Sequence, residues 1–173
     1  MSLLRSAMRR LHKPIYESRQ RALVASIQPH LRSGDRVLDV GCGFGSLGRA
    51  LMDDPRCPEG VVVQGLERVA RDGAIIDVTA YEGGRMPFDD GAYDVVIVAD
   101  VLHHEEDDEA LLRECSRVAA RHVVLKDHRR QGVLAQSRIS FIDWAANAPY
   151  GVPCLFRSVS YTHLTLPTNC GVG

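Results

Sequence analysis

The chain has 173 residues, of which 45% are hydrophobic and 25% charged, and its formal net charge is −1. These values are typical of an ordinary globular protein with one core, and a near-neutral charge gives no general attraction to nucleic acid. No apolar run approaches the ~20 residues that a membrane-spanning helix requires. The five cysteines are scattered without a CxxC pair, which favours reduced thiols in a cytoplasmic protein over disulfides or a metal site.

Residues 1–33 are predicted to form an N-terminal helical segment. Residues 3–15 place leucine, alanine and methionine at helical spacing opposite arginine and lysine, and a second apolar stripe runs from Leu23 to Leu31. We favour a helix that packs on the domain or covers it as a lid. The alternative is that its apolar and basic faces contact an anionic membrane surface.

From residue 34 to residue 157, strand and helix patterns alternate and predict one domain. The predicted strands are short apolar runs, at residues 36–40, 61–66, 78–81, 93–99 and 122–126. The predicted helices are at residues 46–53, 107–119 and 131–147. This alternation predicts an α/β fold with a parallel sheet, doubly wound because right-handed crossovers place helices on both faces.

Several glycines and acidic residues come directly after predicted strands. They are Gly41, Gly43, Gly45, Glu67, Glu82 and Asp100. Because the carboxyl ends of parallel strands meet at one edge of the sheet, we expect these residues to converge on one ligand cleft, although they lie far apart in the sequence.

The sequence VLDVGCGFG, residues 37–45, turns from the first strand into the helix that follows it. A dinucleotide fingerprint places a third glycine or an alanine where this chain has Ser46. Asp39, two residues before the first glycine, would repel a pyrophosphate but suits a ligand that carries an ammonium and a sulfonium. The alternative role for this carboxylate is to cap the amides of its own loop.

Glu67 follows the second predicted strand, 22 residues after Gly45. A carboxylate in this place can accept hydrogen bonds from both hydroxyls of a ribose. Nicotinamide and adenosylmethionine proteins share this feature, so Glu67 indicates a ribose without choosing between the two cofactors. The alternative is a solvated surface glutamate.

Three segments together carry a family resemblance: VLDVGCGFG, then GLE, then YEGGRMPFDDGAYDVVIVADVLHH. In this order and spacing, over about residues 20–128, the chain resembles class I S-adenosylmethionine-dependent methyltransferases of the small-molecule type. The resemblance implies a Rossmann-like sheet of seven strands, of which five parallel strands are present here. The later segment VVLKDHRRQGVLAQSRISFIDWAANAPYGV resembles a narrower bacterial group within that class.

The resemblance also implies which residues hold S-adenosylmethionine. Asp39, Gly41 and Gly43 would face the methionine moiety. Gly45 belongs to the same glycine turn and is also assigned to the cofactor site. Glu67 would bind the ribose.

Two further residues receive roles from the same resemblance. Glu82, four residues before Met86, would accept a hydrogen bond from the adenine amino group, and Asp100 would line the cleft near the methionine end. Only residues 68–77 separate the second and third strands, so the helix that usually flanks the adenine is expected to be a single turn or absent.

Methyl transfer from a sulfonium requires an aligned acceptor and the exclusion of water, and it requires a base only if the acceptor loses a proton. The candidate catalytic bases are His104 and His128, which follow the fourth and fifth strands, with His103 and Asp127 beside them. The alternative for either histidine is a structural place in a loop. A metal site on His103 and His104 is disfavoured because adjacent side chains diverge.

Two other functions stay open at this point. A nicotinamide-dependent oxidoreductase would share the fold, and a non-catalytic module would hold adenosylmethionine without turnover. Methylation of nucleic acid is disfavoured because the core lacks a basic, aromatic-rich face. The sequence favours an enzyme that methylates a small molecule, and it does not indicate the oligomeric state.

Residues 158–173 are expected to be an artefactual tail. The sequence VSYTHLTLPT, from Val159 to Thr168, resembles the in-frame translation of an adapter used to prepare DNA for sequencing. In that case the natural chain continues beyond Arg157, and the strand at residues 122–126 presents an unpaired edge. The polypeptide as written is then expected to be poorly soluble or loosely folded.

Overall fold

The computed structural model describes residues 17–69, 71–127 and 163–167. Its strands are β1 (Arg36–Val40), β2 (Val62–Glu67), β3 (Asp77–Ala80), β4 (Tyr93–Ala99), β5 (Ala119–Lys126) and β6 (His163–Pro167). Its helices are a helix over residues 17–27, the 3-10 turns η1 (Gln28–His30) and η2 (Leu102–His104), and the α-helices α2 (Ser46–Asp53) and α3 (Asp108–Val118). The strands and helices predicted between residues 36 and 126 are all present.

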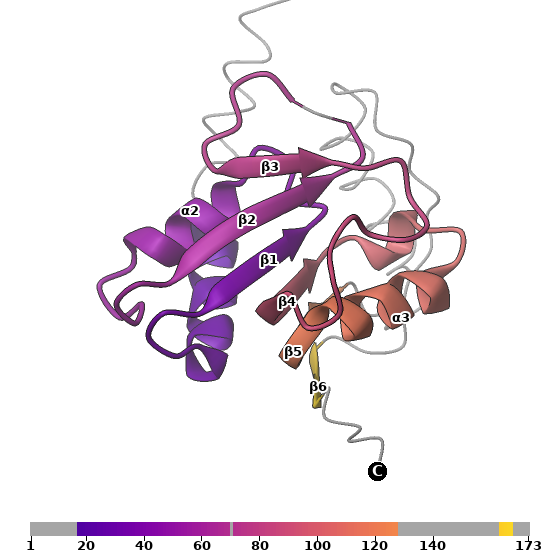
Figure 1. Ribbon diagram of the computed structural model, residues 1–173. Helices are drawn as coiled ribbons and strands as arrows, with labels where there is room; N and C mark the ends of the chain where they lie inside the picture. Colours follow the sequence, from indigo (N-terminus) through magenta and orange to yellow (C-terminus); the bar gives the residue numbers. More distant parts are fainter. Residues whose placement is uncertain (1–16, 70, 128–162, 168–173) are drawn as a thin grey trace, which may run out of the picture.

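One sheet of six strands forms the centre of the molecule, in the order β3-β2-β1-β4-β5-β6 (Figure 1). Strands β1 to β5 pair in parallel, which confirms the predicted α/β class with five parallel strands. From β1 the chain continues to β2 and β3 on one side of the sheet, and it then returns to β4 and β5 on the other side of β1. The carboxyl ends of β1 and β4 therefore form the switch point of the sheet, where ligands of such folds bind.

The edge of β5 is paired, so the expectation of an unpaired edge is wrong. Strand β6 runs antiparallel to β5, in register from His122 opposite Pro167 to Lys126 opposite His163. An exposed edge offers a row of free N–H and C=O groups to any extended segment. The origin of residues 158–173 stays a prediction, as do the domain bounds at residues 33 and 157.

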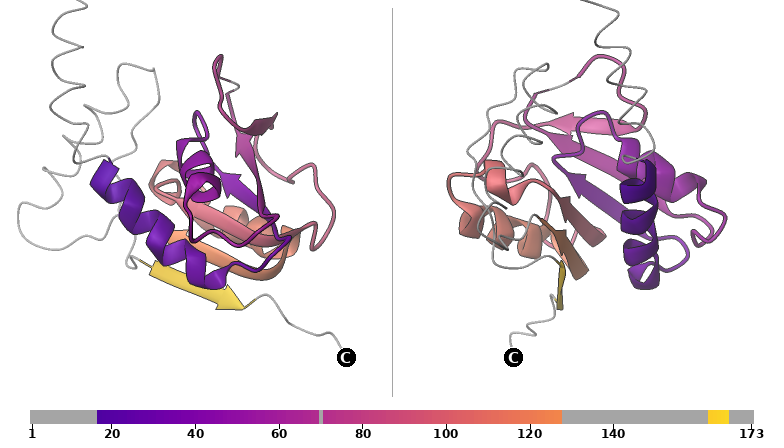
Figure 2. Two further views of the ribbon diagram at one scale, coloured as in Figure 1. Left: turned by 90° about the vertical axis from the view of Figure 1, so that its left-hand side faces the viewer. Right: turned by 180° about the vertical axis from the view of Figure 1, so that it is seen from behind.

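Side chains of β4 alternate between two hydrophobic cores, one on each face of the sheet. Val96 and Val98 pack in the core that includes α3, whereas Val95 and Ile97 pack in the core that includes α2 and the helix over residues 17–27. Figure 2 shows these helices on opposite faces of the sheet. The doubly wound arrangement is therefore confirmed, and it leaves the ends of the strands as the accessible edges.

Helix α3 begins where the sequence supplies a cap. The Asp107 carboxylate accepts a hydrogen bond from the amide of Ala110 at 2.8 Å, and two further acidic residues, Asp108 and Glu109, stand in the first turn. These negative charges satisfy free amides and complement the helix dipole.

Three sequence-based expectations concern other parts of the chain. The amphipathic helices expected at residues 3–15 and 131–147 lie outside the described residues, as does His128. The crossover from β2 to β3 contains turns and bends but no helix in its described residues, 68–69 and 71–76, which agrees with its shortness. Within the described ranges, no helix has the length and apolar character needed to cross a bilayer.

Candidate functional site

The glycine turn after β1 is tied to β2 and opens at its second glycine. The Gly41 amide donates to the Leu66 carbonyl at 2.8 Å. Gly41 has a φ of 69°, and a Cβ added there would lie 2.5 Å from a methyl group of Val101, so only glycine fits. Gly43 also has a left-handed φ, 59°, but a Cβ added there would meet no atom within 4 Å. The backbone at Gly43 therefore faces open space.

Asp39 is a buried carboxylate beneath this turn. It is 2% exposed, and the amide of Gly48, in the first turn of α2, hydrogen-bonds to it. Its second oxygen, Oδ2, has no hydrogen-bond partner among the described residues. Burial raises the pKa of Asp39 to about 7 against the effect of the Gly48 amide, and the nearby Glu67 charge adds to the rise. This bond caps the start of α2 and satisfies only part of the carboxylate, whereas the alternative of capping the amides of the loop itself stays a prediction.

Glu67 closes the turn from the side of β2. Its Oε2 accepts from the amide of Gly43 at 2.7 Å, and its Oε1 accepts from the amide of Arg68 at 2.9 Å. Each carboxylate oxygen can accept more than one hydrogen bond, so room for ligand hydroxyls remains. The Cys42 thiol lies in the same negative surroundings, because burial first, and then Asp39 and Glu67, raise its pKa to about 12. A raised pKa keeps the thiol protonated near neutral pH, and a protonated thiol is a weak nucleophile.

Asp100 joins three elements at the end of β4. Its backbone has a φ of 58°, a left-handed conformation that is uncommon outside glycine. Its carboxylate is hydrogen-bonded to Arg19, from the helix over residues 17–27, and to Lys126, from β5. Burial lowers the pKa of Lys126, and the Asp100 charge opposes that shift. Asp100 therefore stands at the carboxyl end of β4 with its carboxylate bonded to two cationic side chains.

Some of the cofactor residues predicted from the sequence contact one another, and one of them lies apart. Asp39, Gly43 and Glu67 are linked by the contacts described above, and Gly45, which is buried, is the N-cap residue of α2. Glu82, in contrast, is exposed in the loop after β3. The amide of Tyr81, just before it, donates to the Glu67 carbonyl at 3.1 Å, so the loop that carries Glu82 starts beside β2.

The two histidines after β4, His103 and His104, differ in burial and in their contacts. His103 is 3% exposed, and its ring Nδ1 lies 2.7 Å from an oxygen of Asp127, which is itself 1% exposed. His104 is half-buried, and its ring centroid lies 4.1 Å from that of His103. The carboxylate thus orients His103, whereas His104, the predicted base, is the more accessible of the two. The structure describes no groups of three or more metal-ligating side chains.

Some residues of this edge were missed because their partners are distant in sequence. Arg68 lies 2.5 Å from Glu105, a pair that joins the end of β2 to the loop after η2. Arg19 reaches Asp100 across 81 positions. Neither contact has a local pattern, although a basic residue directly after Glu67 is a weak signal for an ion pair at the end of β2.

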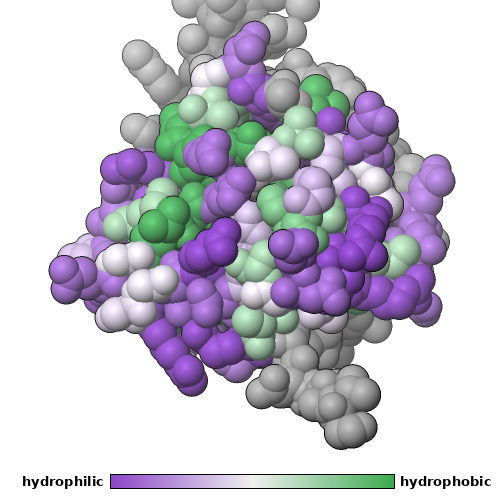
Figure 3. Space-filling model, viewed as in Figure 1, coloured by the Kyte–Doolittle hydropathy of each residue, from purple (hydrophilic) through white to green (hydrophobic). Residues whose placement is uncertain are grey.

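The surface around β2 and β3 is partly apolar. Phe44, Val69 and Ile75 are exposed, and the Arg71 guanidinium lies 5.3 Å from the centre of the Phe44 ring. Figure 3 shows hydrophobic atoms on the side of this face where β2 and β3 lie, and more hydrophilic atoms over α3. Apolar side chains beside a charged edge suit a ligand that combines an apolar ring with polar groups.

Comparisons with known proteins agree with this geometry. A family model described as a methyltransferase domain matches residues 38–125, from β1 to β5. The chain is 34% identical over 97 residues to the ubiquinone biosynthesis O-methyltransferase of Sodalis glossinidius, covering 49% of this chain and 37% of that protein. It is 36% identical over 93 residues to the ajmaline N-methyltransferase of Rauvolfia serpentina, covering 49% and 32%.

A solved structure supports the fold. The [4+2]-cyclase SpnF superposes with a TM-score of 0.55 at 20% identity, covering 64% of this chain and 46% of that chain. The cyclase name shows that this fold alone does not specify a reaction. The chain spans about a third of the length of the curated relatives that it matches, with coverages of 37% and 32%.

Proposed function

The chain belongs to the methyltransferase domain family, and from this premise we propose that it transfers a methyl group from S-adenosylmethionine to a small-molecule acceptor. The observation that carries the proposal is the buried Asp39 carboxylate, whose Oδ2 has no hydrogen-bond partner within the described residues. A buried carboxylate that one amide compensates only in part is costly, and a cationic ligand would compensate it further.

The described residues fit this cofactor at two points of the glycine turn. Asp39 offers negative charge from below, and the open backbone at Gly43 allows a close approach from above. In the proposal, Asp39, Gly41, Gly43 and Gly45 surround the methionine end. S-adenosylmethionine supplies an electrophilic methyl group on a positively charged sulfur.

The remaining cofactor residues come from three strand ends. Glu67 would bind the ribose hydroxyls while it continues to hold the Gly43 amide. Glu82, exposed in the loop after β3, would accept from the adenine amino group. Asp100 would line the methionine end, and its bonds to Arg19 and Lys126 hold it in place.

The acceptor is proposed to be a small molecule because the curated relatives include proteins named for ubiquinone biosynthesis and for ajmaline. Those names specify an O-methyltransferase and an N-methyltransferase, so the atom that receives the methyl group varies among relatives. Where the acceptor must lose a proton, His104 is the proposed base among the described residues, supported by the packed ring of His103. His128 is the second proposed base.

The alternatives are less favoured. A nicotinamide-dependent oxidoreductase would place a pyrophosphate above Asp39, where the two negative charges repel each other. A module that binds adenosylmethionine without turnover shares the proposed site, so binding measurements do not exclude it and product formation does.

The test is methyl transfer by the chain as it stands. The protein is incubated with S-adenosylmethionine labelled in its methyl group and with a panel of phenols, amines and acidic carbon acceptors. Labelled product and adenosylhomocysteine are expected with at least one acceptor class, and Asp39→Asn is the matched control that should bind the cofactor poorly. Binding without transfer to any acceptor would favour the holding module, and absence of binding would reject the proposal.

A further inference from the structure

The loop between β3 and β4 is held at both ends. It carries Glu82 and spans residues 81–92. At its start, the Tyr81 amide donates to the Glu67 carbonyl at 3.1 Å. Close by, a Cβ added at Gly83 would lie 3.4 Å from the Arg68 guanidinium. The first anchor therefore lies against the end of β2, beside Glu67, the residue proposed to bind the ribose.

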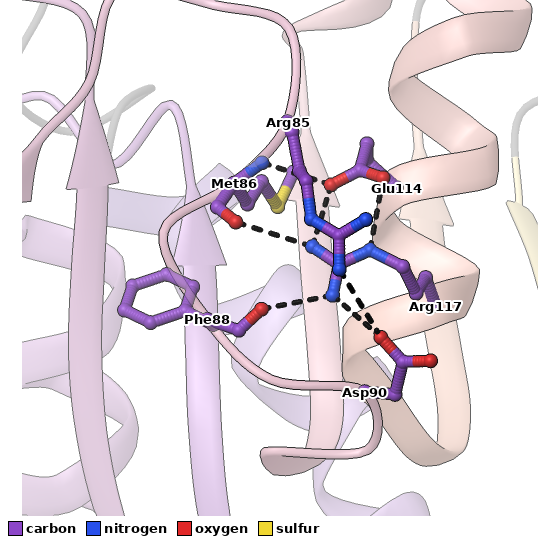
Figure 4. A network of polar contacts seen from close by, with 6 residues as sticks. All are labelled: Arg85, Met86, Phe88, Asp90, Glu114 and Arg117. Atoms are coloured by element: carbon purple, nitrogen blue, oxygen red, sulfur yellow. Dashed lines mark hydrogen bonds and ion pairs between the residues drawn. The ribbon is translucent and has the colours of Figure 1, made fainter.

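The second anchor is on α3 and centres on Arg117. Its Nη1 donates to the Phe88 carbonyl and to Asp90 Oδ1, each at 2.8 Å, and its Nη2 donates to the Met86 carbonyl at 3.1 Å. Glu114 completes the arrangement, because its Oε2 accepts from the Met86 amide at 2.8 Å and from Arg117 at 2.7 Å. Figure 4 shows the Arg117 guanidinium between the loop and Glu114.

This anchor is strong by its chemistry and its burial. The side chains of Arg117 and Glu114 are only 16% and 20% exposed, and the Met86 side chain is buried in the core. A guanidinium presents several donors in a fixed plane, which is what contact with two carbonyls and two carboxylates requires. A lysine ammonium in the same place keeps the charge but cannot reach all four groups.

We propose that Arg117, together with Glu114, is a positioning residue for the cofactor site, which it serves by fixing residues 82–85 between two anchors. The inference rests on the proposed function, since it concerns the affinity of that same site. Arg117 itself touches no ligand in this arrangement. It acts through the loop.

The physical reason is pre-organisation. Four residues held at both ends have few conformations, whereas the same residues released from α3 would have to be ordered when the ligand binds. Gly83 and Gly84, with φ values of 99° and 72°, make this segment intrinsically adaptable. The anchor therefore reduces the ordering cost that would otherwise weaken binding.

The chain offers a control arginine whose partners lie outside the loop. Arg121 in β5 donates to both oxygens of Asp35, at 2.9 and 2.5 Å, and to Asp94 at 3.4 Å, and its side chain is 21% exposed. It also donates to the His30 carbonyl at 3.4 Å, so it has three polar partners, where Arg117 has four, and a similar burial. Because none of the partners of Arg121 lies in residues 81–92, its replacement does not release the loop that carries Glu82.

The experiment compares Arg117→Lys with Arg121→Lys in the full chain, with thermal unfolding, calorimetric binding of adenosylhomocysteine and amide hydrogen exchange. Both variants are expected to lose stability, but only R117K is expected to bind about tenfold more weakly. The amides of residues 82–85 should exchange faster in ligand-free R117K and be unchanged in R121K.

Two outcomes would overturn the inference: equal affinity in R117K and the wild type, or an equal loss of affinity in R117K and R121K. If R117K does not fold, Glu114→Gln, which removes the charge but keeps an acceptor near Met86, gives the same test with the same expected direction. Failure of the wild type to bind adenosylhomocysteine would instead reject the proposed function.

Discussion

Asp35, directly before β1, and Asp39, near the end of β1, are almost equally buried and have opposite electrostatic surroundings. Their exposed fractions are 3% and 2%. Burial alone would raise the pKa of Asp35, but hydrogen bonds from the Arg121 guanidinium and the Arg32 amide, with the charges of both arginines, lower it overall. No arginine or lysine among the described residues contributes to the pKa of Asp39, which burial raises to about 7.

The opposite pKa shifts of Asp35 and Asp39 indicate a structural role for Asp35 and a ligand-binding role for Asp39. At the amino end of the sheet, a buried carboxylate is paired with a cation, and the pair joins β5 to the start of β1. At the carboxyl end, a buried carboxylate destabilises the ligand-free protein, because its charge is only partly compensated. Residues that lower the stability of the ligand-free protein and form no compensating contact within it are expected where a ligand binds.

Among the substitutions, the largest loss of stability is expected at Asp35, which forms the ion pair with Arg121. Asp35→Asn leaves the Arg121 guanidinium without its closest carboxylate, and we expect a loss of about 3 kcal/mol in the free energy of unfolding. Urea unfolding at pH 7.5 measures this loss. Affinity for S-adenosylmethionine should change little once the protein is folded, so a large loss of affinity would contradict the division between the two ends.

Replacing Asp39 should instead lower the affinity for the cofactor. Asp39→Asn removes the charge that would face the sulfonium and ammonium of the ligand, and we expect affinity for S-adenosylmethionine to fall about 30-fold, or about 2 kcal/mol. Calorimetric titration of the wild type, D39N and D35N measures this. Unchanged affinity in D39N would assign Asp39 to helix capping alone.

Stability against pH sharpens the same comparison. Between the ordinary aspartate value of 3.8 and the folded pKa of about 7, Asp39 is protonated only in the folded state. Its contribution to the ligand-free protein is therefore most favourable below 3.8 and falls as the pH rises toward about 7, by about 4 kcal/mol at about 1.4 kcal/mol per pH unit. Asp35 has the opposite sign, because its lowered pKa gives stability that is lost as the pH falls through the folded value.

The variant test of this linkage uses D39N at pH 8. Removing the charge gains about 4 kcal/mol, and the buried amide that replaces it costs about 2 kcal/mol for its unsatisfied hydrogens. Ligand-free D39N should then be more stable than the wild type by about 2 kcal/mol. Equal or lower stability of D39N at pH 8 would contradict an uncompensated charge.

The smallest expected effect concerns the open backbone of the turn. Gly43→Ala places a Cβ at a φ of 59°, which we expect to cost about 1 kcal/mol of stability. The methyl group also projects into the space proposed for the ligand, so affinity should fall about tenfold. Gly34→Ala, with a φ of 79° and no atom within 4 Å of an added Cβ, is a control at the amino end that should leave affinity unchanged.

Local patterns were enough to predict most of the fold and the glycine turn. The apolar run at residues 93–99 and the turn at residues 37–45 have short-range signals, and Asp39 was distinguished by its charge at one fixed spacing. The hydrogen bond that the Gly43 amide donates to Glu67 was not foreseen, although both residues were assigned to the site.

Contacts between distant residues could not be predicted in this way. The pairing of His103 with Asp127 depends on the register of β4 and β5, and the edge strand β6 depends on which segment reaches β5. Such contacts are decided by tertiary packing, for which a single sequence has no periodic signal.

The most direct test of the central claim is a pair of calorimetric titrations of the wild type at pH 8, one with S-adenosylmethionine and one with NADH. Asp39 is mostly ionised at this pH, given its pKa of about 7. We expect saturable heat with S-adenosylmethionine and none with NADH, whose pyrophosphate would meet a buried negative charge. Saturable binding of NADH without binding of S-adenosylmethionine would contradict the account.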